Sequence, residues 1–199
     1  MSSEDDQVHL AVLNEAMHRI GGPNEGATIE SFDEGAEGVP DTRRRYTTVI
    51  NGLYGRHTWT WLVTLHQLVR ESEAPEAGYA YAYSAPAPGD IRAVYRDADA
   101  RHPFHDFRKI DGKVHANETA LWAEVRTGSH PDRWPDYFRT LAVTALAWEF
   151  CIPAGGDLRL ANELKAEAFG PPHEFPHGGL LRTPKQLDGQ TEAGGVLTF

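Results

Sequence analysis

The sequence is poor in the residues that build metal cages, disulfides and membrane spans. It holds one cysteine, Cys151, among 199 residues, so it can form neither an internal disulfide nor a zinc site made of several cysteines. No apolar run approaches the ~20 residues that cross a bilayer, which predicts that the chain is not an integral membrane protein. The first residues, MSSEDDQ, are acidic and lack the basic-then-apolar order of a secretory signal peptide.

Basic residues are scarce at the N-terminal end. The net charge is −10, and residues 1–41 hold ten acidic residues against one basic residue, Arg19. The rest of the chain is close to neutral and lacks the basic stripe that marks a DNA-gripping surface. This distribution suits either simple solubility or a surface past which DNA moves without adhering.

Motifs of known reactive sites are also missing. There is no G-x-S-x-G turn around a nucleophilic serine, no Walker A loop and no dinucleotide-binding glycine pattern. Two groups combine two histidines with an acidic residue, as zinc sites do: His102, His105 and Asp106, and His173, Glu174 and His177. The second group has the H-E-x-x-H spacing, but it stands among prolines that exclude the helix on which that motif holds zinc. We therefore expect no catalytic residue, metal site or cofactor, and we keep a histidine-metal-dependent hydrolase that uses the first group as the alternative.

Apolar periodicity predicts four helices, with a β region between the second and the third. Stop signals such as Gly21-Gly22-Pro23 and Gly170-Pro171-Pro172 set the ends of the first and the last. Asp132 is expected to cap the third helix. The predicted helices span residues 3–21, 42–55, 132–152 and 157–169.

Alternating patterns predict a small antiparallel sheet within residues 59–127. Residues 59–70 read mostly as strand, although one face of a helix would also fit. Further strands are expected in YAYAYS (79–84), IRAVYR (91–96) and ALWAEVRT (120–127), and Asp111-Gly112 predicts a two-residue hairpin turn. We therefore predict an α+β fold, mainly α: a helical bundle with a small antiparallel β insertion, forming one domain over residues 1–171.

Two charged segments are candidates for contacts between subunits. Residues 24–41 form a long acidic connection, and connections of this length are usually functional or disordered. The next helix begins with three arginines, although positive charge there opposes the helix dipole. Partners outside the helix, such as the acidic loop or a neighbouring subunit, would explain this run. The predicted subunit-contact residues are Arg43, Arg44, Arg45, Glu30, Asp33 and Glu34.

Residues 172–199 lack helical or strand periodicity but carry large apolar side chains at intervals. Exposed apolar side chains gain nothing in water. The pattern therefore predicts an extended C-terminal arm that docks into grooves of a partner, and a disordered terminus is the alternative. The predicted partner-binding residues are Phe175, Leu180, Leu181, Leu187 and Phe199.

Four motifs occur in a characteristic order. They are HLAVLNEAMHRIGGP followed by IESFDE, RHTWTW (56–61), YAYAYSAPAPGDIRAVY (79–95), and WPDYF (134–138) at the head of an alanine-rich helix. In this order they resemble the head-to-tail adaptor (connector) proteins of tailed bacteriophages, and are similar to the tail tubular protein A group, over residues 8–169. The short β region and the Pro/Gly-rich tail depart from that pattern and leave the tail type open.

The resemblance implies a structural protein of the virion and not an enzyme. Adaptors of this kind form a ring, expected to be a dodecamer, that joins the portal protein to tail or neck proteins. DNA would pass through the ring during ejection without sequence-specific binding. The protein would be made in the host cytoplasm and end in the neck of the virion, away from any membrane. Another neck protein, such as a tail terminator, is the alternative within this class.

Overall fold

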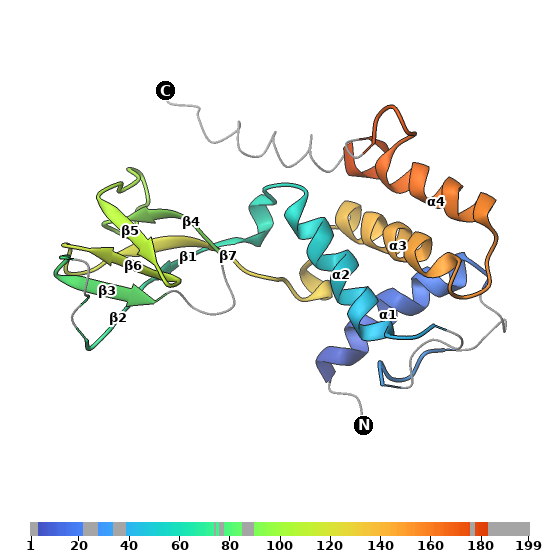
Figure 1. The fold of residues 1–199 in the computed structure, drawn as a ribbon, viewed down its shortest axis with the longest axis horizontal. Coiled ribbons are helices and arrows are strands. Elements are labelled where there is room, and N and C mark those ends of the chain that lie inside the picture. The colour runs from blue at the N-terminus through green and yellow to red at the C-terminus, as the bar shows by residue number, and fades with distance from the viewer. Residues whose placement is uncertain are drawn as a thin grey trace. The chain divides into compact units, whose positions relative to one another are not determined.

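The computed structural model of the chain describes residues 4–21, 28–33, 39–73, 75, 78–84, 90–175 and 178–182. Within these residues the chain has the predicted α+β fold, with four α-helices and two small antiparallel sheets. It divides into two compact units (Figure 1). Met1–Trp59 and Ser129–Phe199 make up the first, called the helical unit below, and Thr60–Gly128 makes up the second, called the β unit.

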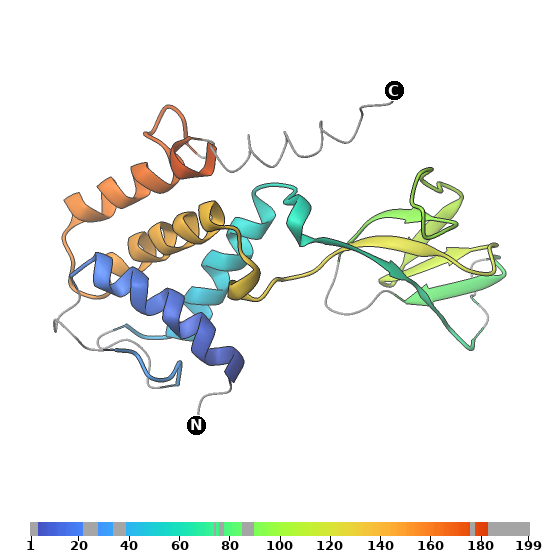
Figure 2. The same cartoon turned by 180° about the vertical axis from the view of Figure 1, so that it is seen from behind.

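Four helices build the helical unit: α1 (Glu4–Arg19), α2 (Thr42–Gly55), α3 (Asp136–Cys151) and α4 (Leu158–Phe169). The central helix is α3, which packs against each of the other three (Figures 1 and 2). It is buried on all sides, since residues 141–147 are buried without interruption, whereas α2 buries one face through Tyr46, Ile50 and Leu53. Although α3 is apolar, neither it nor any other described helix has the length and hydropathy of a membrane span.

The helix ends lie close to the predicted ones except at the start of α3. Sequence analysis began this helix at Asp132, but Pro131–Arg133 forms a short 3-10 helix (η2) and α3 begins at Asp136. Trp134 is extended (ψ 131°), because a proline ring disfavours the helical conformation of the residue before it. The residue at the N-cap of α3 is Pro135, so the prediction that Asp132 caps the helix was wrong.

Seven strands of the described chain form the β unit: β1 (Val63–Gln67), β2 (Val69–Arg70), β3 (Tyr81–Ser84), β4 (Asp90–Tyr95), β5 (Phe107–Ile110), β6 (Lys113–Ala116) and β7 (Trp122–Arg126). The first sheet has the order β1-β7-β4 and the second has the order β2-β3-β6-β5. Residues from both sheets share one core, among them Tyr83, Val94, Val114 and Val125. The insertion therefore contains two sheets around a common core, where the sequence predicted one.

Local turn chemistry predicted the β5–β6 hairpin but not the course of residues 59–70. Asp111 and Gly112 both have positive φ (50° and 76°), as the two-residue turn requires, and Ile110 pairs with Lys113. The segment predicted as mostly strand contains a 3-10 turn, η1 (Thr60–Leu62), and then the separate strands β1 and β2. β1 and β2 join different sheets, and Leu68 between them is buried in the core that the two sheets share.

Candidate functional site

Aromatic side chains form a cluster where the chain leaves the helical unit and where it returns. Tyr54 stacks on Phe138 with ring centroids 5.6 Å apart, and Trp59 and Trp134 meet Phe138 edge-on at 5.1 and 5.2 Å. Trp59 and Phe138 are completely buried. The indole N–H of Trp59 donates to the carbonyl oxygen of Leu53 at 3.0 Å, which satisfies its one polar group. Folding thus brings together the RHTWTW and WPDYF motifs, which lie far apart in the sequence.

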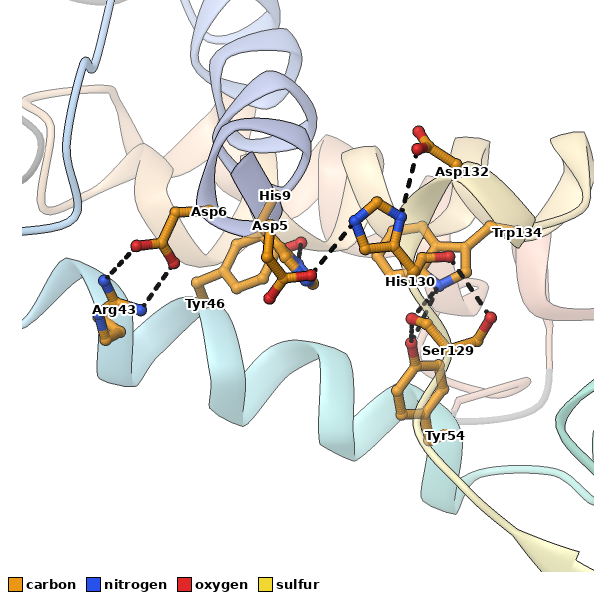
Figure 3. A network of polar contacts seen from close by, with 10 residues as sticks. All are labelled: Asp5, Asp6, His9, Arg43, Tyr46, Tyr54, Ser129, His130, Asp132 and Trp134. Atoms are coloured by element: carbon orange, nitrogen blue, oxygen red, sulfur yellow. Dashed lines mark hydrogen bonds and ion pairs between the residues drawn. The ribbon is translucent and has the colours of Figure 1, made fainter. Parts of the chain in front are cut away.

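Hydrogen bonds fix the returning segment to this aromatic cluster (Figure 3). The carbonyl oxygen of Ser129 accepts hydrogen bonds from the hydroxyl of Tyr54 at 2.9 Å and from the indole of Trp134 at 3.0 Å. The same indole nitrogen lies 2.9 Å from the Tyr54 hydroxyl. Burial raises the pKa of Tyr54 to about 12, so the hydroxyl keeps its proton and donates throughout the neutral range. The first residue after the β unit is therefore anchored to α2 and to the segment before α3.

Two histidines connect α1 to the same region. The imidazole of His130 lies between two carboxylates, with Nε2 3.3 Å from Asp5 and Nδ1 3.3 Å from Asp132 (Figure 3). Its ring meets that of His9 edge-on with centroids 5.8 Å apart. On its other side, His9 has its Nδ1 atom 2.9 Å from the hydroxyl of Tyr46. Burial lowers the pKa of His9 and raises that of Tyr46, so both groups are neutral in this contact at neutral pH.

Acidification is expected to destabilise the helical unit through His9. Its pKa in the folded chain lies below the ordinary value of 6.5, mainly because of burial. The stability contributed by neutral His9 is therefore present above about pH 6.5 and is lost as the pH falls through the lower folded value. We expect His9→Gln to lose less free energy of unfolding than the unmodified chain between about pH 7 and about pH 5, measured by urea unfolding. The control is His18→Gln, an exposed position on the same helix, and an equal loss in all three proteins would contradict the assignment.

Each of the three arginines predicted to contact subunits has an acidic partner in its own chain. The pairs and their N–O distances are Arg43–Asp6 (3.0 Å), Arg44–Asp41 (2.7 Å) and Arg45–Glu149 (2.8 Å). The first pair is bidentate, with two parallel contacts of 3.0 Å (Figure 3). Only one of the three acids, Asp41, belongs to the acidic segment 24–41. A role of these arginines between subunits stays a prediction. Within the chain, Arg43 joins α2 to α1 and Arg45 joins α2 to α3, whereas Arg44 pairs only with Asp41 just before its own helix.

The predicted acidic contact residues lie at the surface where the structure describes them. Glu30 and Asp33 are exposed, and Glu34 lies outside the described residues. The buried residue beside Glu30 is Ile29, whose N–H donates to Oδ1 of Asn14 at 2.8 Å and whose carbonyl accepts from Nδ2 of Asn14 at 3.1 Å. The two hydrogen bonds fix the backbone of this segment to α1, so the backbone next to Glu30 is held in place.

Residues 178–181 pack on the helical unit and do not belong to an arm that begins at residue 172. The N–H of Gly178 donates to the carbonyl oxygen of Phe169 at 3.0 Å, and a short 3-10 helix, η3 (Gly179–Leu181), contacts α3 and α4. Gly179 has a φ of 58°, and a Cβ atom there would lie 2.4 Å from the carbonyl oxygen of Glu167, so only glycine fits. Leu181 is completely buried. It is therefore a core residue of its own chain and not an anchor available to a partner.

Phe175 keeps an exposed apolar surface. It is 42% exposed, whereas Leu180 is half-buried. Leu187 and Phe199 lie outside the described residues, so their partner-binding role stays a prediction. Phe175 also meets Phe169 edge-on with ring centroids 6.0 Å apart, which joins it to the end of α4.

A groove of about 530 Å³ runs beside α4, and we call it the α4 groove. Its lining residues are Asn162, Lys165, Ala166, Gly170, Pro172 and Phe175. Two cations flank the ring of Phe175: Nζ of Lys165 lies 4.9 Å from its centroid, and the guanidinium carbon of Arg56 lies 5.9 Å from it. Each cation also lies over a second ring, Lys165 over Trp148 at 5.3 Å and Arg56 over Phe169 at 4.5 Å. The groove is thus an apolar platform with positive charge at its rim.

The histidine groups do not assemble into a metal site within the described part of the chain. No three His, Cys, Asp or Glu side chains are gathered there in a way that could hold an ion. Cys151 is buried, and burial raises the pKa of its thiol, which disfavours the reactive thiolate. His177 lies outside the described residues. The other histidine-group residues are all exposed: His102, His105, Asp106, His173 and Glu174.

Sequence reasoning missed several residues that the structure adds to these surfaces. Asp5 and Asp6 indicated only a favourable first turn of α1, although they pair with His130 and Arg43. The partners of these contacts are far apart in the sequence, so no spacing could reveal them. The one available signal was the combination of an acidic helix start with an arginine run on the next helix.

No protein-family model matches the chain, and no curated protein sequence is similar enough to count as a match. The likeness to adaptor proteins therefore rests on the sequence motifs alone.

Proposed function

We propose that this chain is a structural subunit of a phage virion, a head-to-tail adaptor that assembles as a ring between the portal protein and the tail or neck proteins. The observation that carries the proposal is the buried aromatic cluster. Trp59 comes from RHTWTW, and Trp134 and Phe138 come from WPDYF, so two of the four motifs serve one structural purpose. This shared packing explains why large aromatic residues stand at those positions.

The order of the remaining motifs supports the same proposal. The first motif covers most of α1 and continues into the segment held by Asn14, and the third covers β3 and β4 of the β unit. A helical unit built from both ends of the chain, with a β unit inserted between α2 and α3, is the arrangement that the resemblance implies. Each unit has its own core, which suits a subunit that contacts different proteins through different parts.

The charge distribution supports contact with proteins and not a grip on DNA. The only run of three basic residues in the sequence, Arg43 to Arg45, is neutralised by Asp6, Asp41 and Glu149 of the same chain. DNA binding depends on cations that are free to replace the counterions of phosphates. A ring of such subunits would let DNA pass without sequence-specific binding.

Copurification with the portal protein tests the proposal. The chain and the portal protein encoded in the same genome are expressed together, and the mass of the purified complex is measured. We expect a stable complex with one adaptor chain for each portal subunit, and no complex with the portal protein of an unrelated phage. Binding to the tail tube protein alone would indicate another neck protein, such as a tail terminator. A hydrolytic activity that His102→Ala abolishes, in a chain without portal affinity, would overturn the proposal.

A further inference from the structure

We infer that the α4 groove receives the acidic segment 28–33 of the next subunit, a second copy of this chain. The inference rests on the proposed ring and names the contact that would close it. The contacting residues are Glu30 on one copy, and Arg56, Lys165 and Phe175 on the other.

The two cations of the groove are the reason for assigning an acidic occupant. Arg43, Arg44 and Arg45 are each paired within the chain, but neither Arg56 nor Lys165 forms an ion pair with any described residue. Burial lowers the pKa of Arg56, since a half-buried guanidinium without a counter-charge is disfavoured. A carboxylate that enters the groove would supply this counter-charge.

The apolar part of the groove favours a protein segment over a free anion. Phe175 exposes 42% of its surface, and the groove beside it holds about 530 Å³. Ala166, Pro172 and Phe175 supply the apolar part of its lining, whereas Gly170 is packed against Gly178 of the same chain. An occupant that brings both an acidic group and aliphatic carbon atoms matches this lining.

Segment 28–33 offers such an occupant in Glu30, whose carboxylate stands on aliphatic carbon atoms, whereas Ile29 and Phe32 are buried in their own chain. Glu30 is exposed and forms no ion pair with a described residue, and the side chain of Asp33, three positions later, is also exposed. The two hydrogen bonds between Ile29 and Asn14 hold the segment before any partner arrives. A held segment loses little conformational freedom on binding, which favours association.

The two surfaces belong to different elements of the helical unit. Segment 28–33 is fixed to α1 through Asn14 and to α2 through Phe32, whose ring lies 5.3 Å from that of Tyr46. The groove is formed by α4 and the residues that follow it. When each copy passes its segment to the groove of the next copy in one direction, the contact is heterologous, and repeating it around an axis closes a ring or extends a filament. The inferred contact therefore fits a ring.

Charge reversal tests the contact in the full chain. We expect Lys165→Glu and Glu30→Lys each to weaken self-association about tenfold, because an attractive pair becomes a repulsive one. Sedimentation velocity over a concentration series measures the association. An equimolar mixture of the two variants should associate as the unmodified chain does, since every contact in an alternating assembly again joins opposite charges. Arg133→Glu and Glu4→Lys reverse exposed charges elsewhere on the helical unit and should have no such effect.

Cross-linking provides the outcome that would overturn the inference. Chains with Glu30→Cys and Lys165→Cys are mixed and treated with a short bismaleimide, and the native Cys151 is buried in both. We expect a dimer joined between positions 30 and 165, and only background with Glu4→Cys in place of Glu30→Cys. No cross-link above that background overturns the inferred contact. The proposed function is judged separately, because a chain that lacks this contact but still binds the portal protein leaves it standing.

Discussion

Trp59→Ala is expected to lower the free energy of unfolding of the helical unit by about 3–5 kcal/mol, which is the usual loss when a buried tryptophan is removed. Trp59 is completely buried, and its ring packs on Phe138 of the central helix. Its removal opens a cavity between α3 and the end of α2 and leaves the carbonyl oxygen of Leu53 without its indole donor. Urea unfolding monitored by helical circular dichroism measures the loss.

The matched control for Trp59→Ala is Trp122→Ala in the β unit. Trp122 is half-buried on β7, so its removal opens no enclosed cavity and should have a clearly smaller effect. Trp59→Phe should keep part of the stability, because a ring still meets Phe138. Equal losses in Trp59→Ala and Trp122→Ala would contradict the view that the aromatic cluster holds the helical unit together.

A chain that ends at Gly170 is expected to be several kcal/mol less stable than one that ends at Arg182. The longer chain keeps η3, whose Leu181 is completely buried against the helical unit. Removing one such leucine side chain generally lowers the free energy of unfolding by about 2–5 kcal/mol, and the shorter chain also loses the hydrogen bond from Gly178 to Phe169. Urea unfolding of both chains measures the difference.

Two point variants separate packing from chain length. Leu181→Ala should reproduce much of the loss, whereas Leu180→Ala, at a half-buried position, should have a smaller effect. If the two truncated chains were equally stable, residues 171–182 would not belong to the helical unit, and the arm predicted to begin at residue 172 would stand as the better description.

The parts of the fold that could be predicted depend on local signals. The bounds of α2 were predicted as residues 42–55, because its apolar stripe and the glycine at its end act within a few residues. The turn at Asp111 and Gly112 is likewise a local preference. The start of α3 was missed because the effect of Pro135 on Trp134 outweighed a good capping residue.

The parts that could not be predicted depend on contacts between distant segments. Strand β1 pairs with β7, so Val63 lies opposite Arg126, and the separation of two sheets cannot be seen in either strand alone. The partners of the charged surface residues could not be predicted from local sequence either. The arginine run was recognised as a charged feature, but its partners Asp6 and Glu149 lie on other helices, and the cations of the α4 groove come from α4 and the end of α2.

Electron microscopy of the chain bound to its portal protein is the measurement that tests the central claim most directly. The account predicts a closed ring of this chain on the portal, with one copy for each portal subunit and a central opening through which DNA passes. Segment 28–33 of each copy should lie against α4 of its neighbour. A chain that appears as separate monomers or two-fold dimers away from the portal would contradict the assignment as an adaptor.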